Sequence, residues 1–256
     1  MAETILSAGP LVIALAGGIL PALVWLWFWR KFDHENPEPT GLIALSFTAG
    51  MAVVFFVLPV QKIIVELMPF IMNGVDLLAA QFSIIPPIDD TVQAILWSFT
   101  EEFGIFATVF LVAYHSKNFD EPIDAIIYLI TAALGFAAME NALYLLKDFS
   151  QGGIATVLLD SNLRFIGATV LHIIAAAILG VAFAFAFYRR FWVQFIAGFI
   201  GIAIATLLHA HFNLSIMEAQ GTIGTLAVFA RFWAAIIGII VLIEVVKRLQ
   251  KPQHLL

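Results

Sequence analysis

Residues 123–146 read IDAIIYLITAALGFAAMENALYLL, an almost uninterrupted apolar run. A helix that rises 1.5 Å per residue crosses a hydrocarbon core of about 30 Å with about 20 residues. The run is therefore long enough to span a membrane, yet it carries Glu140 followed by Asn141. A charged side chain at the bilayer centre costs roughly 2.5–3.5 kcal/mol on insertion scales. We infer a transmembrane helix that also carries part of a functional site.

Six further apolar stretches flank this run. Of all residues, 62% are hydrophobic and only 12% are charged, and the mean hydropathy is +1.01. Average soluble domains carry about 25% charged residues, so a soluble enzyme, a disordered tail and a fibrous protein are excluded. The sequence predicts an all-α, polytopic membrane helix bundle of about seven transmembrane helices, as one integral membrane domain over residues 1–256. The six other predicted spans cover residues 9–29, 41–64, 92–114, 163–187, 191–212 and 223–246.

Two features of the composition restrict the chemistry and the partners. The chain contains no cysteine, which excludes disulfides, thiolate metal sites and a cysteine nucleophile. Its formal net charge is −6 and no basic stripe occurs, so we expect no nucleic-acid partner. The lipid bilayer is the expected surrounding of the whole domain.

Basic residues gather at one end of the predicted spans. The loops at the other end, after the second and the sixth span, contain no Lys or Arg, and the loop after the fourth holds only Lys147. The positive-inside rule then places the N-terminus outside and the C-terminus in the cytoplasm, as an odd number of spans requires. No basic residue precedes the first span, so we expect a retained helix there. The basic residues at the predicted cytoplasmic end are Arg30, Lys31, Lys117, Arg189, Arg190, Lys247, Arg248 and Lys251.

Three polar segments lie between the spans. Residues 33–39 (DHENPEP) predict a cytoplasmic turn broken by proline. Residues 69–90 are mixed in character, and we expect an outer interfacial or re-entrant helix followed by a loop. Asp120, Glu121 and Asp124 predict a capped helix start.

The polar residues inside the spans predict the functional site. From the orientation, they lie in the outer half of four antiparallel helices, where they can meet. His209 and Asn213 are four residues apart and share a helix face, whereas His211 points away. Intramembrane ionisable groups mark functional sites by default. The candidates are Glu101, Glu102, Glu140, His172, His209 and Asn213.

Glutamates and histidines in one pocket favour hydrolysis, and two schemes stay open. Two histidines with one or two glutamates suit Zn²⁺ or another divalent metal with an open position for water. Without a metal, a glutamate activates the water directly. Intramembrane Glu and His chains also form proton relays, so a proton-coupled transporter or channel is the alternative.

Several motifs together resemble the PrsW intramembrane protease family, within the CAAX protease and bacteriocin-immunity superfamily. They are DHENPEP at 33–39, EE at 101–102, FDEPID at 119–124, GFAAMENALY at 135–144, His172, and HAHFN at 209–213. The resemblance implies site-1 type cleavage of a single-span membrane protein, such as an anti-sigma factor, near the extracytoplasmic face of a bacterial cytoplasmic membrane.

The resemblance also implies roles for the candidates. It makes Glu101 and Glu102 the catalytic pair, one of them the base. It makes Glu140, His172 and His209 metal ligands or transition-state stabilisers, and brings in Asn213 through the H-x-x-x-N motif.

The chain departs from the family at one position. Ile105 stands where the family often carries lysine, so a catalytically silent member that only binds membrane proteins is a further alternative. Arg164 is a candidate to replace that lysine in space.

Overall fold

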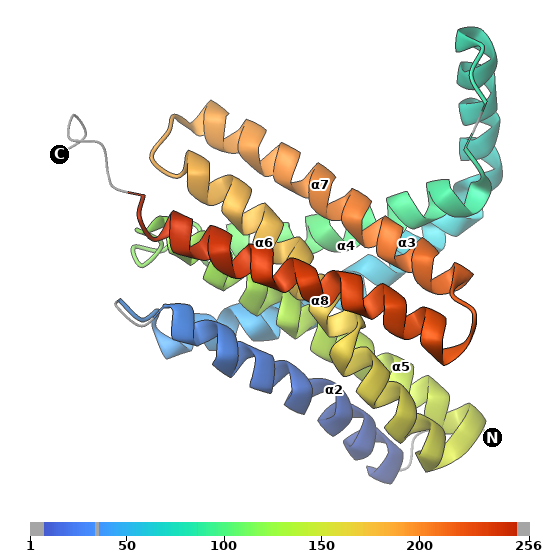
Figure 1. Cartoon of the computed structure of the whole chain (residues 1–256), viewed down its shortest axis with the longest axis horizontal. Helices are drawn as coiled ribbons and strands as arrows, with labels where there is room; N and C mark the ends of the chain where they lie inside the picture. Colours follow the sequence, from blue (N-terminus) through green and yellow to red (C-terminus); the bar gives the residue numbers. More distant parts are fainter. Residues whose placement is uncertain (1–7, 34–35, 86, 250–256) are drawn as a thin grey trace.

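The fold is a bundle of long helices (Figure 1). The computed structural model describes residues 8–33, 36–85 and 87–249, and only the backbone of residues 151–162. No strand occurs among these residues, which confirms the all-α prediction. In chain order the elements are α2 (Ala8–Trp29), the 3-10 helix η1 (Arg30–Phe32), α3 (Thr40–Phe82), α4 (Asp89–Val112), α5 (Pro122–Ile166), α6 (Ala168–Ala186), α7 (Phe191–Glu218) and α8 (Gly221–Val246).

Seven segments in the described part of the chain are long and apolar enough to cross a membrane, as predicted. Of the predicted turn at residues 33–39, the structure describes Asp33 and residues 36–39. Pro86, Lys251 and both chain ends lie outside the described residues. The start of α2 and the end of α8 lie at opposite ends of the bundle (Figure 1), as an odd number of crossings requires.

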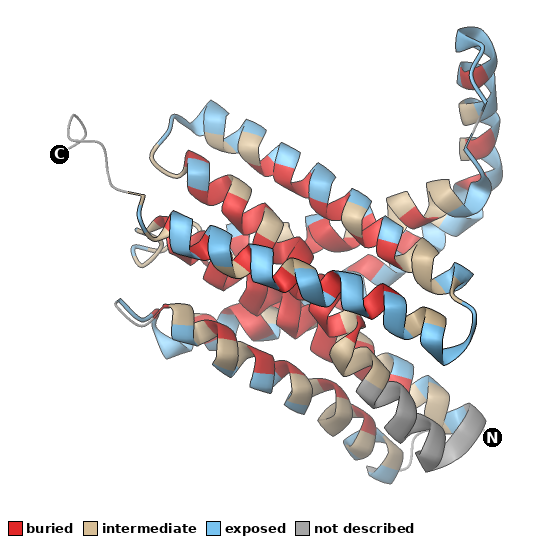
Figure 2. Ribbon diagram, viewed as in Figure 1, coloured by how far each residue is buried: buried red, intermediate tan, exposed pale blue. Residues whose placement is uncertain are grey.

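Helices α5 and α6 form the centre of the bundle. In the most apolar window of the α5 span 94% of residues are buried, and in the span that contains α6 78% are, against 22–39% in the other five spans. Figure 2 shows this as a buried centre with exposed outer helices. The first half of α5 is therefore surrounded by protein, which lowers the cost of the polar residues Glu140 and Asn141 at its end.

Small residues let neighbouring helices approach α5 closely. A Cβ atom on Gly135 of α5 would lie 1.9 Å from the backbone oxygen of Phe47 in α3. A Cβ atom on Gly50 of α3 would lie 2.1 Å from the backbone oxygen of Ala132. Helix association in membranes depends on such packing, because lipid tails are as apolar as side chains. Gly135 and Gly50 therefore allow α3 and α5 to pack with their backbones in close contact.

The prediction for residues 41–90 needs one correction. We expected a span ending near Ile64 and a separate helix after Pro69, but α3 continues through both Pro59 and Pro69 to Phe82. A proline inside a membrane helix bends it without ending it when neighbouring groups satisfy the freed carbonyl. The last part of α3 turns away from the bundle (Figure 1). The expected loop is present and begins at Ser83, which adopts the left-handed conformation.

Two other boundaries differ from the prediction. The element α5 continues past Leu146 to Ile166, and its end returns beside its middle, where Arg164 contacts Asn141. The fifth span begins at Leu163, as predicted, and Gly167 separates α5 from α6. A Cβ atom on Gly167 would lie 2.3 Å from the Phe229 ring of α8, so the break lets α8 approach closely. Helix α7 extends beyond the predicted end at Phe212 to Glu218, because no proline or glycine interrupts it there.

Candidate active site

The predicted polar residues line one cavity of about 610 Å³ between α4, α5, α6 and α7. This volume falls in the range of small-molecule and substrate sites. Five of the six candidates line it, and Glu102 does not. The structure thus brings together residues from four helices, and their positions span more than 100 residues of the sequence. The five are Glu101, Glu140, His172, His209 and Asn213.

His209 of α7 lies between the two glutamates of α4. Its Nδ1 is 2.7 Å from Oε1 of Glu102, and its Nε2 is 3.4 Å from Oε2 of Glu101. Glu102 is completely buried behind the imidazole, whereas Glu101 faces the cavity. The adjacent glutamates therefore hold the two ring nitrogens of one histidine from different sides.

Glu101 has a second partner, which the sequence analysis missed. Its Oε1 accepts a hydrogen bond of 2.7 Å from Nε2 of Gln61, a buried residue of α3. Oε2 of Glu101 is buried with no hydrogen-bond partner among the described residues. Gln61 is a polar residue inside a predicted span, so the rule that singled out the glutamates also applies to it.

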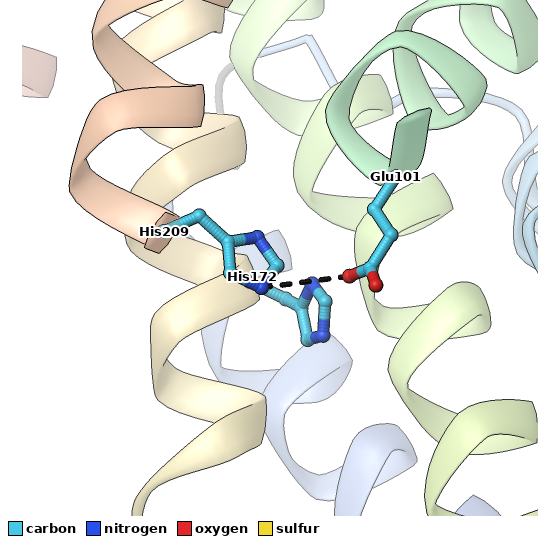
Figure 3. A group of neighbouring side chains, drawn as sticks. All are labelled: Glu101, His172 and His209. Carbon is cyan, nitrogen blue, oxygen red and sulfur yellow. Dashed lines mark ion pairs between the residues drawn. The ribbon is translucent and has the colours of Figure 1, made fainter. Parts of the chain in front are cut away.

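His172 of α6 connects this group to Glu140 of α5. Nε2 of His172 is 3.4 Å from Oε2 of Glu140, and its ring centroid is 5.1 Å from that of His209. Figure 3 shows the two imidazole rings and the Glu101 carboxylate close together, on three different helices.

Arg164 neutralises the other side of Glu140. Its Nη1 lies 3.9 Å from Oε2 of Glu140 and donates a 2.9 Å hydrogen bond to Oδ1 of Asn141. The guanidinium also lies 3.5 Å from the centroid of the Tyr144 ring. Asn141 in turn donates to the hydroxyl of Thr169. Arg164 therefore provides positive charge next to Glu140. We had considered it as a replacement for the lysine next to the Glu101–Glu102 pair.

Two further expectations have clear outcomes. His211 is exposed, so it points away from the cavity as predicted. Ile105 has no exposed surface and packs in the apolar core. One turn away, Oε2 of Glu102 is buried without a hydrogen-bond partner among the described residues, so no described side chain takes the place of the family's lysine.

The donor set fits a divalent metal. One ligand atom each from Glu101, His172 and His209 lies within 4.8 Å of the other two. Each histidine has a carboxylate on one nitrogen, Glu102 for His209 and Glu140 for His172, which is the usual support of metal-binding imidazoles. Nδ1 of His172 is buried without a partner among the described residues. The structure therefore groups Glu101 with the two histidines and leaves Glu140 as a supporting carboxylate.

Comparison with known proteins identifies the family of the chain. The family described as "PrsW family intramembrane metalloprotease" matches residues 38–243. The chain belongs to the PrsW family. Membership shows that the protein is an intramembrane protease, and with the seven apolar spans it places the PrsW chain in a bacterial membrane.

Several bacterial relatives named Protease PrsW are similar to the chain. The one from Geobacillus kaustophilus is 26% identical over 87% of this chain and 88% of its own length. That from Halalkalibacterium halodurans is 26% identical over 78% of this chain and 81% of its own length. That from Oceanobacillus iheyensis is 30% identical over 52% of this chain and 54% of its own length. No solved structure matches the chain.

Proposed function

We propose that this PrsW protein hydrolyses a peptide bond of a single-span membrane protein by adding a water activated at Glu101. The observation that carries the proposal is the position of Glu101 at the cavity, beside a histidine whose other nitrogen is held by Glu102. Glu102, buried behind His209, is then a positioning residue. An anti-sigma factor is the substrate type that the motif resemblance suggests.

The proton transfers require only the chain's own residues. Oε2 of Glu101 takes a proton from water as the water oxygen attacks the carbonyl carbon of the substrate. The electron pair of the carbonyl double bond moves to its oxygen, and the Asn213 side chain, which lines the cavity, offers N–H donors to that oxyanion. Glu101 then returns the proton to the leaving nitrogen as the C–N bond breaks, which leaves a carboxylic acid and an amine.

Two schemes for the water remain, with and without a metal. Zn²⁺ or another divalent metal would be held by Glu101, His172 and His209 and would supply a Lewis acid that lowers the pKa of water. In that scheme Glu140 is the cavity carboxylate outside the donor set of the metal and the candidate proton acceptor. Glu101 is essential in both schemes.

Cleavage on the extracytoplasmic side is supported by the depth of the site. His209 lies nine residues before the end of α7 at Glu218, about 14 Å at 1.5 Å per residue. The other end of α7 begins next to Arg189 and Arg190, about 27 Å from His209 by the same rise. The cavity is therefore nearer the end without basic loops, which the positive-inside rule places outside.

Glu101→Gln tests the proposal in liposomes that contain a single-span reporter substrate. We expect cleavage to fall by about 10²–10⁴-fold, the usual contribution of a general base. Glu66→Gln is the matched control, because it makes the same change at an exposed position of α3 and should retain full activity. Undiminished cleavage by Glu101→Gln would contradict both schemes.

Metal content of the purified protein separates the two schemes. One bound metal per chain, with cleavage lost on chelation and restored by Zn²⁺, supports the metal scheme. Full activity without metal and in the presence of chelator supports direct activation by Glu101.

A further inference from the structure

A second group of carboxylates lies at the opposite end of α5 from the active site. It joins two polar segments that stand out in the sequence, residues 33–39 and residues 119–124. One carboxylate oxygen each from Glu38, Asp120 and Asp124 lies within 4.8 Å of the other two. Asp124 and Glu140 are 16 residues apart on α5, so this acidic group lies about 24 Å from the active site along the helix.

Two of the three carboxylates are removed from water. Asp124 is 1% exposed and Glu38 is 4% exposed. One carboxylate oxygen of each lies within 4.8 Å of the other, and the hydroxyl of Tyr128 donates a hydrogen bond to Oε2 of Glu38. Two buried carboxylates this close repel each other when both are ionised, so a proton or a cation must lie between them.

Asp124 has an unused ligand atom in this group. Its Oδ2 accepts hydrogen bonds from the backbone N–H groups of Asp120 and Glu121, at 2.8 and 2.6 Å, and so caps the start of α5. Its Oδ1 is buried and has no hydrogen-bond donor among the described residues. A buried carboxylate oxygen without a partner indicates an atom that the protein itself does not supply.

The nearby basic side chains do not neutralise the group. Nη2 of Arg30 donates to the backbone oxygen of Glu38, at 3.4 Å, and not to its carboxylate. Nζ of Lys247 pairs with Glu244 at 3.1 Å. In the described part of the chain, none of the three clustered carboxylates has a basic nitrogen within 4 Å.

We propose that Glu38, Asp120 and Asp124 bind a divalent cation at the end of the bundle that faces the cytoplasm. Three carboxylates without nitrogen or sulfur donors favour a hard, oxygen-preferring ion, Mg²⁺ or Ca²⁺. The ion ties the segment before α3 to the start of α5, the central helix, and so holds together the end of the bundle remote from the cavity. This site is independent of the proposed catalytic mechanism.

Ion binding is measured on the full-length protein in lipid nanodiscs after removal of metals. The thermal midpoint should rise by at least about 2–4 °C with saturating Mg²⁺ or Ca²⁺, because an ion that binds only the folded state stabilises it. Tb³⁺, an oxygen-preferring probe ion, should give luminescence sensitised by Tyr128. Asp124→Asn and Asp120→Asn should each weaken Tb³⁺ binding at least tenfold and abolish the thermal shift.

Two control variants make the result specific. Glu101→Gln alters the active site and should leave the Mg²⁺ or Ca²⁺ shift unchanged. Asp89→Asn removes an exposed carboxylate from the first turn of α4 and should also bind Tb³⁺ like the parent protein. Asp120 is exposed, so its variant keeps the test valid if Asp124→Asn fails to fold.

Two outcomes would overturn the proposal. One is a parent protein whose thermal midpoint does not respond to either ion, which would mean that a shared proton alone separates Glu38 from Asp124. The other is Tb³⁺ binding of equal affinity in the parent protein and in Asp120→Asn.

Discussion

At the residue scale, the site shows how a membrane protein tolerates three glutamates inside its spans. Unpaired and charged, they would cost about 8–10 kcal/mol together on insertion scales, comparable to the net stability of a domain. Each has a specific partner instead. Glu101 accepts from Gln61, Glu102 contacts His209, and Glu140 lies between His172 and Arg164. The polar partners are as necessary to the fold as the glutamates are to the proposed chemistry.

Glu102→Gln is expected to slow turnover without abolishing it. The amide keeps the size of the side chain but removes the charge that orients and supports His209. Loss of such a supporting carboxylate typically costs 10–100-fold in activity or metal affinity. We expect kcat to fall by this factor with KM nearly unchanged, measured on the reporter substrate. A loss as complete as in Glu101→Gln would mean that Glu102 itself handles the proton.

At the element scale, the central helix depends on small residues. Gly135 lies against the backbone of α3, and the site residue Glu140 lies little more than one turn further along the same helix. The same helix α3 carries Gln61, which donates to Glu101 of α4. The position of α3 against α5 can therefore affect the cavity through Gln61.

Gly135→Ala is expected to destabilise the bundle. The added Cβ would lie 1.9 Å from the backbone oxygen of Phe47, so the two helices must separate. Overpacking of this kind costs about 1–3 kcal/mol and more when backbone must move. Gly74→Ala, with nothing within 4 Å of the new Cβ, is the control. Equal free energies of unfolding for both variants in detergent would show that the contact is relaxed.

With divalent cations removed, the end of the bundle that carries Glu38 is expected to lose stability as pH rises. Burial raises the pKa of Glu38 above 4.5, although the Tyr128 hydroxyl lowers it, and burial raises the pKa of Asp33 in the same way. The folded state then holds more protons than the unfolded chain, so stability is full below about pH 4.5 and falls as pH rises through the raised pKa. The slope is at most about 1.4 kcal/mol per pH unit for each proton.

Glu38→Gln checks this dependence. In the presence of chelator, its free energy of unfolding should change less with pH than that of the parent protein, because the amide does not titrate. A parent protein that becomes more stable between pH 5 and 7 would contradict the sign.

At the scale of the whole molecule, orientation decides which compartment the cavity serves. The chain has no cysteine, so single cysteines can report on topology without background. Asp89→Cys and His115→Cys place them at and just beyond the two ends of α4, both exposed. We expect a membrane-impermeant maleimide to label Asp89→Cys in intact cells and His115→Cys only after permeabilisation. The reverse pattern would place the cavity on the cytoplasmic side.

The sequence was sufficient to predict that the membrane-spanning helices exist, because an apolar run of about 20 residues has few structures open to it other than a transmembrane helix. It also pointed to six polar residues that the structure brings together, five at the cavity and Glu102 behind His209, since polar residues in such runs are costly wherever they lie, but it did not point to Gln61. It failed at the ends of α3 and α7. Proline and polar residues there suggested breaks, but a helix supported by neighbours or by the lipid interface continues past them.

The sequence by itself determined that this protein is a membrane helix bundle with buried glutamates and histidines, because both statements follow from the cost of polar groups in lipid. Only the tertiary structure decided how the groups pair. The rotation of α4 sends Glu101 to the cavity and Glu102 behind His209, and the path of the chain brings Arg164 back beside Glu140, although 24 residues separate them. Adjacent residues on a helix differ by about 100° in direction, and which direction meets a partner depends on the rotation of each helix in the bundle.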